Sequence, residues 1–289
     1  MRYIATWSMT PYINGSGTGW IKDEQLFAAM MSSIRRARKW LGVKPIIYTD
    51  TFTATVLRDL TDDAEINEEL EGVYENDGVP HTMWSYSKIK TLSLQTEPYV
   101  HFDLDLFFRQ PLDEKLMEGD LLIQCYDVLD LLEKHAPESF PYLYNYHTIK
   151  DLYVWNGFWD RDWNKHDGAN LGILGMNNME LHNRYIEEIM GWIDVNRDAL
   201  NRHPAHIPDP TFFEQQPMVV LAEEMGLDIR TVFPNSIEYP PICPSYAHFV
   251  GQYKNGDMPL FDNLRALYVD PFITDKVKYY TNKMRSMRK

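Results

Sequence analysis

Short apolar strands alternate with amphipathic helices through the first hundred residues. Residues 2–7 are rich in β-branched and aromatic side chains and predict a strand, and apolar residues at helical spacing predict a helix over 23–41. A second strand follows at 45–50, a helix at 84–94 and a third strand at 99–102. This alternation is typical of an α/β fold with a mixed, mostly parallel sheet.

The second half of the chain is less regular. Strands are expected at 121–126, 171–176 and 230–233, and helices at 179–196 and 211–225. Residues 137–167 combine aromatic, proline and polar residues and predict a long functional loop, in which Trp155, Trp159 and Trp163 either pack together or stack on a ligand. Without an internal repeat or a linker, we predict one domain over 1–270 and a basic, aromatic tail at 271–289.

The charge balance excludes one large class of partner. The 289 residues include 28 basic and 42 acidic side chains, for a net charge of −14, which argues against nucleic acid as a general partner. Two cysteines exclude a disulfide scaffold, and apolar runs too short for a signal peptide or a membrane helix predict a cytoplasmic protein. Residues 276–289 hold six basic and no acidic residues, so this tail either docks peripherally on an anionic membrane or is a frayed terminus.

Two aspartates follow directly on the third predicted strand. In extended geometry Asp103 and Asp105 point to the same side, and two carboxylates at the carboxyl edge of a sheet suit a divalent cation that also binds phosphate oxygens. Solvated loop acids are the alternative for these two residues taken alone.

Four segments together resemble one family of enzymes. The stretch YVHFDLDLFFRQPL resembles the metal-binding motif of GT-A glycosyltransferases. Three further segments are similar, in the same order, to motifs of the retaining family 8 branch, which includes glycogenin-like and bacterial lipopolysaccharide enzymes: NLGIL at 170–174, EQQ at 214–216 and HFVGQYK at 248–254. The resemblance implies a GT-A, Rossmann-like fold and an enzyme that transfers a sugar from a nucleotide-diphosphate sugar.

The resemblance also implies a metal and a diphosphate site. His248 would complete a Mn²⁺ (or Mg²⁺) site with Asp103 and Asp105, since mixed nitrogen and oxygen ligands suit that metal. Gly251 would let the backbone approach a phosphate closely, and Lys254 would place a positive charge on the departing diphosphate.

Residues at the ends of the first two strands would contact the uridine. The resemblance implies this role for Thr6, Trp7 and Asp50, with Trp7 stacking on the base and Asp50 accepting a hydrogen bond from ribose or base. Packing in the core is the alternative for Trp7. Lys88 stands at about the spacing of a basic residue that contacts the donor, but a solvated lysine on a helix face, or Lys90 in its place, fits the sequence equally well.

The remaining candidates concern the transferred sugar. Asn170 stands where the family binds sugar hydroxyls, with Asp167 just upstream as a further donor-binding candidate, and Gln215 stands at the position that faces the anomeric carbon in the family. An amide is a poor nucleophile, so same-face attack through an oxocarbenium–phosphate ion pair is expected, with Gln215 or Glu214 stabilising charge. Glu214 and Gln216 depart from the Asp-Gln-Asp pattern of the family.

These expectations define a function and its alternatives. The chain is expected to move a hexose of glucose or galactose type from a UDP-sugar to a glycan or lipid-linked glycan, in surface polysaccharide biosynthesis. A protein-glycosylating transferase and a non-catalytic carbohydrate-binding protein are the alternatives. The high aromatic content alone fits the last of these, whereas the metal motif followed by His248 and Lys254 argues against it.

Overall fold

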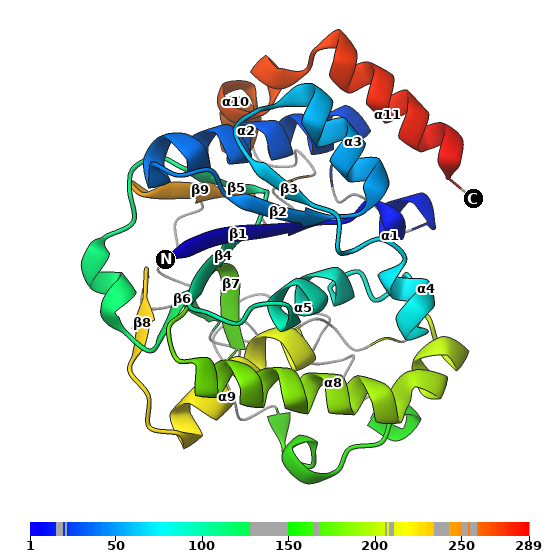
Figure 1. Cartoon of the computed structure of the whole chain (residues 1–289), viewed down its shortest axis with the longest axis vertical. Helices are drawn as coiled ribbons and strands as arrows, with labels where there is room; N and C mark the ends of the chain where they lie inside the picture. Colours follow the sequence, from blue (N-terminus) through cyan, green and yellow to red (C-terminus); the bar gives the residue numbers. More distant parts are fainter. Residues whose placement is uncertain are drawn as a thin grey trace. The chain divides into compact units, whose positions relative to one another are not determined.

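The computed structural model describes residues 1–15, 20, 22–127, 150–163, 168–205, 207, 211–233, 243–249, 254 and 259–288 (Figure 1). The chain forms two compact units. We call Arg2–Gly72, His101–Leu112 and Pro241–Lys289 the terminal unit, and Val73–Val100 with Asp113–Pro240 the central unit. Strand β4 (Tyr99–Phe102) crosses the division between them.

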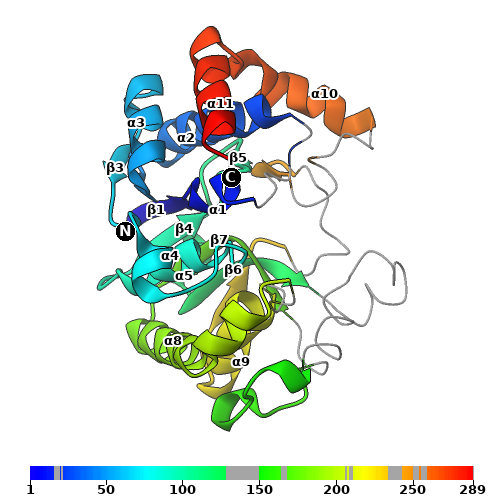
Figure 2. The same cartoon turned by 90° about the vertical axis from the view of Figure 1, so that its right-hand side faces the viewer.

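The terminal unit is built on parallel strands. Strands β1 (Arg2–Trp7), β2 (Ile46–Thr49) and β3 (Glu65–Asn67) lie in the order β3-β2-β1, with Ile4 opposite Ile46 and Tyr48 opposite Asn67. Helices α2 (Asp23–Leu41) and α3 (Thr51–Leu60) lie over these strands (Figure 2). Helix α2 has the predicted bounds and buries the predicted apolar face, which is Leu26, Met30, Ile34 and Ala37.

The terminal unit holds several further elements. Strands β5 (Leu106–Phe108) and β9 (Tyr246–His248) form an antiparallel pair. The other elements are α1 (Thr10–Ile13), α10 (Pro259–Tyr268), the 3₁₀ turn η8 (Asp270–Phe272) and α11 (Asp275–Met287).

The central unit combines one antiparallel and one parallel strand pair. Strand β6 (Leu121–Asp127) pairs antiparallel with β7 (Gly168–Met176) and parallel with β8 (Ile229–Thr231). With the parallel pairs of the terminal unit, this confirms the predicted α/β fold with a mixed, mostly parallel sheet. The helices and short turns are α4 (Val73–Asp77), α5 (Tyr86–Ser93), η1 (Glu114–Glu118), η3 (Lys150–Leu152), η4 (Gly157–Trp159), α8 (Met179–Arg202), η6 (Thr211–Gln215) and α9 (Gln216–Glu224).

The aromatic segment predicted as a functional loop is described only at 150–163. Here two short 3₁₀ turns replace a regular helix. Trp159 and Trp163 are buried, their rings lie 5.4 Å apart, and Trp159 lies 5.6 Å from Trp192 of α8. Packing therefore accounts for these two tryptophans, and Trp155, which is half-buried, joins the same cluster at 5.3 Å from Trp192.

The C-terminal segment is a packed helix where the sequence predicted a tail. Helix α11 buries Val277, Tyr280, Thr281 and Met284, a spacing that places them on one face. This packing contradicts the frayed-terminus alternative for residues 275–287. Among the described residues, no helix is both long and apolar enough to span a membrane.

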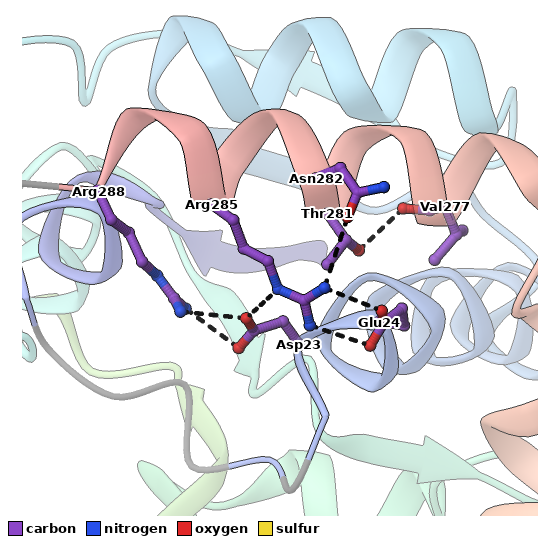
Figure 3. Close-up of polar contacts among 7 residues, drawn as sticks. All are labelled: Asp23, Glu24, Val277, Thr281, Asn282, Arg285 and Arg288. Carbon is purple, nitrogen blue, oxygen red and sulfur yellow. Dashed lines mark hydrogen bonds and ion pairs between the residues drawn. The ribbon is translucent and has the colours of Figure 1, made fainter.

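An ion-pair network joins α11 to the start of α2, as Figure 3 shows. Arg285 Nε lies 2.9 Å from Asp23 Oδ2, and its two terminal nitrogens lie 3.2 and 3.3 Å from the carboxylate oxygens of Glu24. Arg288 contacts both oxygens of Asp23 at 3.1 Å. Asp23 and Glu24 belong to the first turn of α2, where the helix dipole also favours negative charge. The arginines of the predicted tail are thus engaged within the chain.

Replacing Asp23 with Asn should destabilise the protein by about 1 kcal/mol at neutral pH, because two arginine contacts and a favourable helix-dipole contact are lost. Burial acts to raise the pKa of Asp23, but hydrogen bonds from Arg285 and Arg288 outweigh it and hold the pKa below its ordinary value of 3.8. The stabilisation is therefore complete above pH 3.8 and is lost as the pH falls through the lower folded-state pKa.

Urea unfolding of wild-type and Asp23→Asn protein at pH 7 and at descending acidic pH measures this difference. Asp62→Asn, which changes an exposed aspartate of the same unit, is the control. A difference in stability that persists unchanged far below pH 3.8 would contradict the ion-pair account.

Candidate functional site

The two aspartates of the predicted metal motif lie in a turn at the end of β4. The extended geometry predicted for them is wrong, because β4 ends at Phe102 and the backbone N–H of Leu106 donates to the carbonyl of Asp103 at 3.1 Å. This turn leads at once into β5. Leu104, between the two acids, is buried and anchors the turn in the core.

The pairing of β5 with β9 brings a distant histidine to this turn. Leu106 lies opposite His248, and the backbone N–H of Phe249 donates to the carbonyl of Asp105 at 3.1 Å. His248 Nε2 consequently lies 3.1 Å from Asp105 Oδ1. Potential ligand atoms of Asp103, Asp105 and His248 all lie within 4.8 Å of one another, so the structure brings the predicted trio together.

Helix α2 holds β5 in place through a small residue. The hydroxyl of Ser33, which is fully buried, donates to the carbonyl of Leu106 at 2.6 Å. A hydroxyl on the inner face of a helix satisfies a carbonyl that antiparallel pairing with β9 leaves available on the other side. The backbone beside the two aspartates is therefore fixed by α2 as well as by β9.

Lys254 completes the charges around Asp105. Its Nζ lies 2.6 Å from Asp105 Oδ2, so the two oxygens of this carboxylate face His248 and Lys254 respectively. Burial acts to raise the pKa of Asp105, but the Lys254 and His248 charges outweigh it and the pKa lies well below the usual range. Burial acts to lower the pKa of Lys254, and Asp105 more than compensates, so its pKa is raised.

The donor set of this cluster fits a divalent metal. Two carboxylates and an imidazole form a mixed oxygen and nitrogen set, which could bind a divalent cation and leave coordination positions for other ligands. The low pKa of Asp105 keeps it ionised at neutral pH, the form that binds metal. The residues present thus agree with the predicted cofactor.

The end of β1 lies in the same unit and contains two of the predicted uridine contacts. The Thr6 hydroxyl lies 3.0 Å from His101 Nε2. Trp7 stacks on Tyr12, with ring centroids 5.7 Å apart and planes 18° from parallel. Burial raises the pKa of the Tyr12 hydroxyl, Lys254 opposes that rise, and Asp105 and Asp103 add to it.

Tyr12 and His101 escaped the sequence-based prediction. Tyr12 is in the short helix α1 after Pro11, and no motif marked it. His101 carried a readable signal, because it lies near the end of β4, two residues before Asp103.

Asp50 has a structural role that the sequence did not predict. It is 3% exposed and caps α3 by accepting from the backbone N–H of Thr53 at 2.8 Å. Its other oxygen accepts from the Ser8 hydroxyl at 2.8 Å and the Met9 backbone N–H at 2.5 Å. Asp50 therefore fixes the turn after β1, which lies between Trp7 and Tyr12.

A second cluster of predicted residues lies in the central unit. Lys88 of α5 is 8% exposed and Glu214 of η6 is 3% exposed, and Lys88 Nζ lies 2.7 Å from Glu214 Oε1. The same Nζ donates to the carbonyl of Leu171 on β7 at 3.0 Å. The alternative of a solvated helix-face lysine is therefore wrong for Lys88. Lys90 instead pairs with Asp77 at 2.9 Å.

The sugar-binding candidates lie on neighbouring elements of the central unit. Asn170 on β7 is half-buried and accepts from the backbone N–H of Gly172 at 3.1 Å. Gln215 is half-buried at the end of η6 and directly precedes α9. Asp167 and Gly251 lie outside the described residues.

Comparison with known proteins places the chain in a family. Residues 1–260 match a family of unknown function (DUF6734), and the chain belongs to it. None of the curated proteins matches the chain.

Three solved structures are similar to the chain at low identity. The galactosyltransferase LgtC, in complex with donor and acceptor sugar analogues, has 9% identity and a TM-score of 0.46 over 99% of this chain and 96% of that one. The glycosyltransferase GlyE of Streptococcus pneumoniae TIGR4 has 11% identity and a TM-score of 0.42, over 99% of this chain and 63% of that one. Mouse xyloside xylosyltransferase 1 has 11% identity and a TM-score of 0.38, over 80% of this chain and 84% of that one. Likeness this distant assigns neither an activity nor a ligand to this chain.

Replacing Lys88 with Met should destabilise the protein by about 3–5 kcal/mol, because the Glu214 carboxylate then remains buried without its cation. The double variant Lys88→Met/Glu214→Leu should recover much of that loss, since it removes both charges. Urea unfolding of the two variants and of Glu214→Leu measures the coupling. If Lys88→Met and the double variant Lys88→Met/Glu214→Leu were destabilised equally, the two residues would not form a coupled buried pair.

Proposed function

We propose that this protein is a metal-dependent retaining glycosyltransferase of GT-A fold that moves a hexose from a UDP-sugar to a glycan acceptor. One observation carries the proposal: Asp103, Asp105, His248 and Lys254 form a single cluster, although about 150 residues separate the first and the last of them. These are the residues that the sequence motifs select for metal and diphosphate binding. A protein that only binds carbohydrate has no leaving group to stabilise, so it does not require Lys254 beside the metal ligands.

Asp103, Asp105 and His248 would hold the metal, with Mn²⁺ favoured over Mg²⁺ because of the imidazole. When bound, the metal supplies positive charge that binds the diphosphate and stabilises it as a leaving group. Lys254 holds Asp105 ionised and keeps its own charge beside the cluster. Its ammonium would directly stabilise the negative charge that develops on the departing diphosphate.

The turn after β1 would receive the nucleoside. Trp7 and Tyr12 stack in the same unit as the proposed metal ligands, and the charges of Lys254, Asp105 and Asp103 act on the pKa of the Tyr12 hydroxyl, which supports this proposal. An aromatic stack can extend by one further ring, which suits a uracil base. Thr6 and Asp50 would assist this binding, Asp50 through the turn that it fixes.

Further residues would contact the transferred hexose and the diphosphate. We propose that Asn170 binds sugar hydroxyls together with Asp167, and that Gly251 lies near a phosphate. Gln215 would stabilise positive charge at the anomeric carbon by its dipole, since an amide makes a poor covalent intermediate. The buried pair of Lys88 and Glu214 supports this proposal by fixing η6, the turn that carries Gln215, against β7.

The biological setting follows from the same resemblance. Surface polysaccharide biosynthesis, with a glycan or lipid-linked glycan as acceptor, is the setting that we propose. A membrane contact through the C-terminal helix is not required, because Lys276, Arg285 and Arg288 are paired with acids of the terminal unit.

Release of UDP from a panel of UDP-sugars, with and without Mn²⁺, tests the function. At least one donor should be hydrolysed slowly in a metal-dependent way, and Asp103→Asn or Asp105→Asn should reduce the rate by about 100-fold or more because a metal ligand is lost. Asp62→Asn is the matched control on an exposed acid of the same unit. No UDP release from any sugar would favour a carbohydrate-binding protein or another nucleotide.

Metal binding should also be visible as stability. At a Mn²⁺ concentration 100-fold above the Kd, the free energy of unfolding should rise by about 2.7 kcal/mol. Chelation with EDTA should return the melting temperature to its metal-free value, and Asp103→Asn should show no rise. An equal rise in wild-type and Asp103→Asn protein would place the metal elsewhere.

A further inference from the structure

His101 stands directly behind the proposed metal site. It is 1% exposed at the end of β4, two residues before Asp103. Its Nε2 lies 3.0 Å from the Thr6 hydroxyl, and its Nδ1 lies 3.9 Å from Asp103 Oδ1. The first of these contacts is a hydrogen bond, and the second is a longer charge–dipole contact.

The two contacts together select one tautomer of the imidazole. A lone pair on Nδ1 would face the negative oxygen of Asp103 and be repelled, whereas an N–H there is attracted to it. The proton therefore belongs on Nδ1, and Nε2 accepts from the Thr6 hydroxyl. Thr6 can donate in this way because a threonine hydroxyl rotates to suit its partner.

We propose that Thr6 and His101 form a relay that orients the Asp103 carboxylate for metal binding, so that His101 and Thr6 are positioning residues. The inference rests on the proposed metal site and adds residues to it. Histidines bound to metals are often oriented by a carboxylate; here the order is reversed, with a buried histidine orienting a carboxylate ligand. The attraction between the Nδ1–H group and Asp103 Oδ1, 3.9 Å apart, favours rotations of the carboxylate that keep this oxygen near His101.

Two substitutions of His101 separate positioning from simple packing. His101→Asn retains an N–H donor near the Nδ1 position and loses the contact to Thr6. His101→Gln reaches Thr6 instead and leaves no donor near Asp103. If His101 acts through Nδ1, Asn should preserve metal affinity and Gln should not, whereas a role in joining Thr6 to β4 predicts the reverse.

Thr6 supplies a second matched pair. Thr6→Val keeps the shape and removes the hydroxyl, so the imidazole loses the donor that holds its tautomer. Thr6→Ser retains the hydroxyl. The effect of Thr6→Val should disappear in the His101→Gln background, because a relay has nothing to transmit once Nδ1–H is absent.

Mn²⁺ affinity, measured from the electron paramagnetic resonance signal of the free ion, is the readout, with the melting temperature of the metal-free protein measured alongside. We expect the Kd to rise about 10-fold or more in His101→Gln, by a smaller factor in Thr6→Val, and to stay within about threefold of wild type in His101→Asn and Thr6→Ser. The Kd of Asp103→Asn is the reference for a protein in which one of the proposed metal ligands is missing.

The outcomes separate the relay from the site itself. A wild-type Kd no lower than that of Asp103→Asn would overturn the proposed site and the relay with it. If wild type binds more tightly than Asp103→Asn but His101→Gln equals wild type, or if His101→Asn weakens binding more than His101→Gln, the site stands and the relay is wrong. If the increases in Kd caused by Thr6→Val and His101→Gln multiply in the double variant, the relay is also wrong.

Discussion

The antiparallel pairing of β5 with β9 is the constraint on which the candidate site depends. It sets Leu106 opposite His248 and lets Phe249 donate to the carbonyl of Asp105. Backbone hydrogen bonds therefore determine which side chain meets Asp105, and a slip of one residue would turn His248 away from it. Ser33 of α2 holds β5 from its other side, so the core of the terminal unit and the site share one support.

Each unit contains a carboxylate that is stabilised in its charged form by neighbouring basic side chains. Asp105 is ionised between His248 and Lys254, and Glu214 is buried against Lys88. A buried charge with partners contributes little net stability but fixes geometry, because any other arrangement leaves it uncompensated. We infer that both charges are retained for position: Asp105 at the metal cluster, and Glu214 beside Gln215. In a chain with a net charge of −14, a bound cation is also what would let a diphosphate approach these carboxylates.

Local signals in the sequence predicted most of the fold but only part of the site. Helix α2 and strand β4 have the predicted bounds, because their apolar spacing and flanking residues act locally. Helix α11 was missed because its apolar face is short and its basic residues, which resemble a tail, meet Asp23 and Glu24 more than 250 residues away. The order of the motifs predicted that Asp103, Asp105 and His248 belong together. It did not predict how they meet, which is through the turn after β4 and the pairing of β5 with β9.

Other roles depended on contacts that no local pattern carries. Asp50 directly follows β2, where the resemblance implied a uridine contact, and the structure shows that it caps α3 and holds the turn after β1. For Lys88 the sequence left a donor contact and a solvated helix-face lysine open, and the structure shows that Glu214 and the carbonyl of Leu171 retain it in the interior. The two contacts of Lys88 join residues more than 80 positions apart, and the contact of Asp50 with Ser8 joins residues 42 positions apart, so only the tertiary structure specifies them.

The central claim is that a divalent metal binds Asp103, Asp105 and His248 directly. Electron spin echo envelope modulation of Mn²⁺ bound to the whole protein detects a coordinated imidazole nitrogen. Wild-type protein should show nitrogen modulation that changes on ¹⁵N-histidine labelling and vanishes in His248→Gln. Bound Mn²⁺ without nitrogen modulation, or with modulation that survives in His248→Gln, would contradict the account.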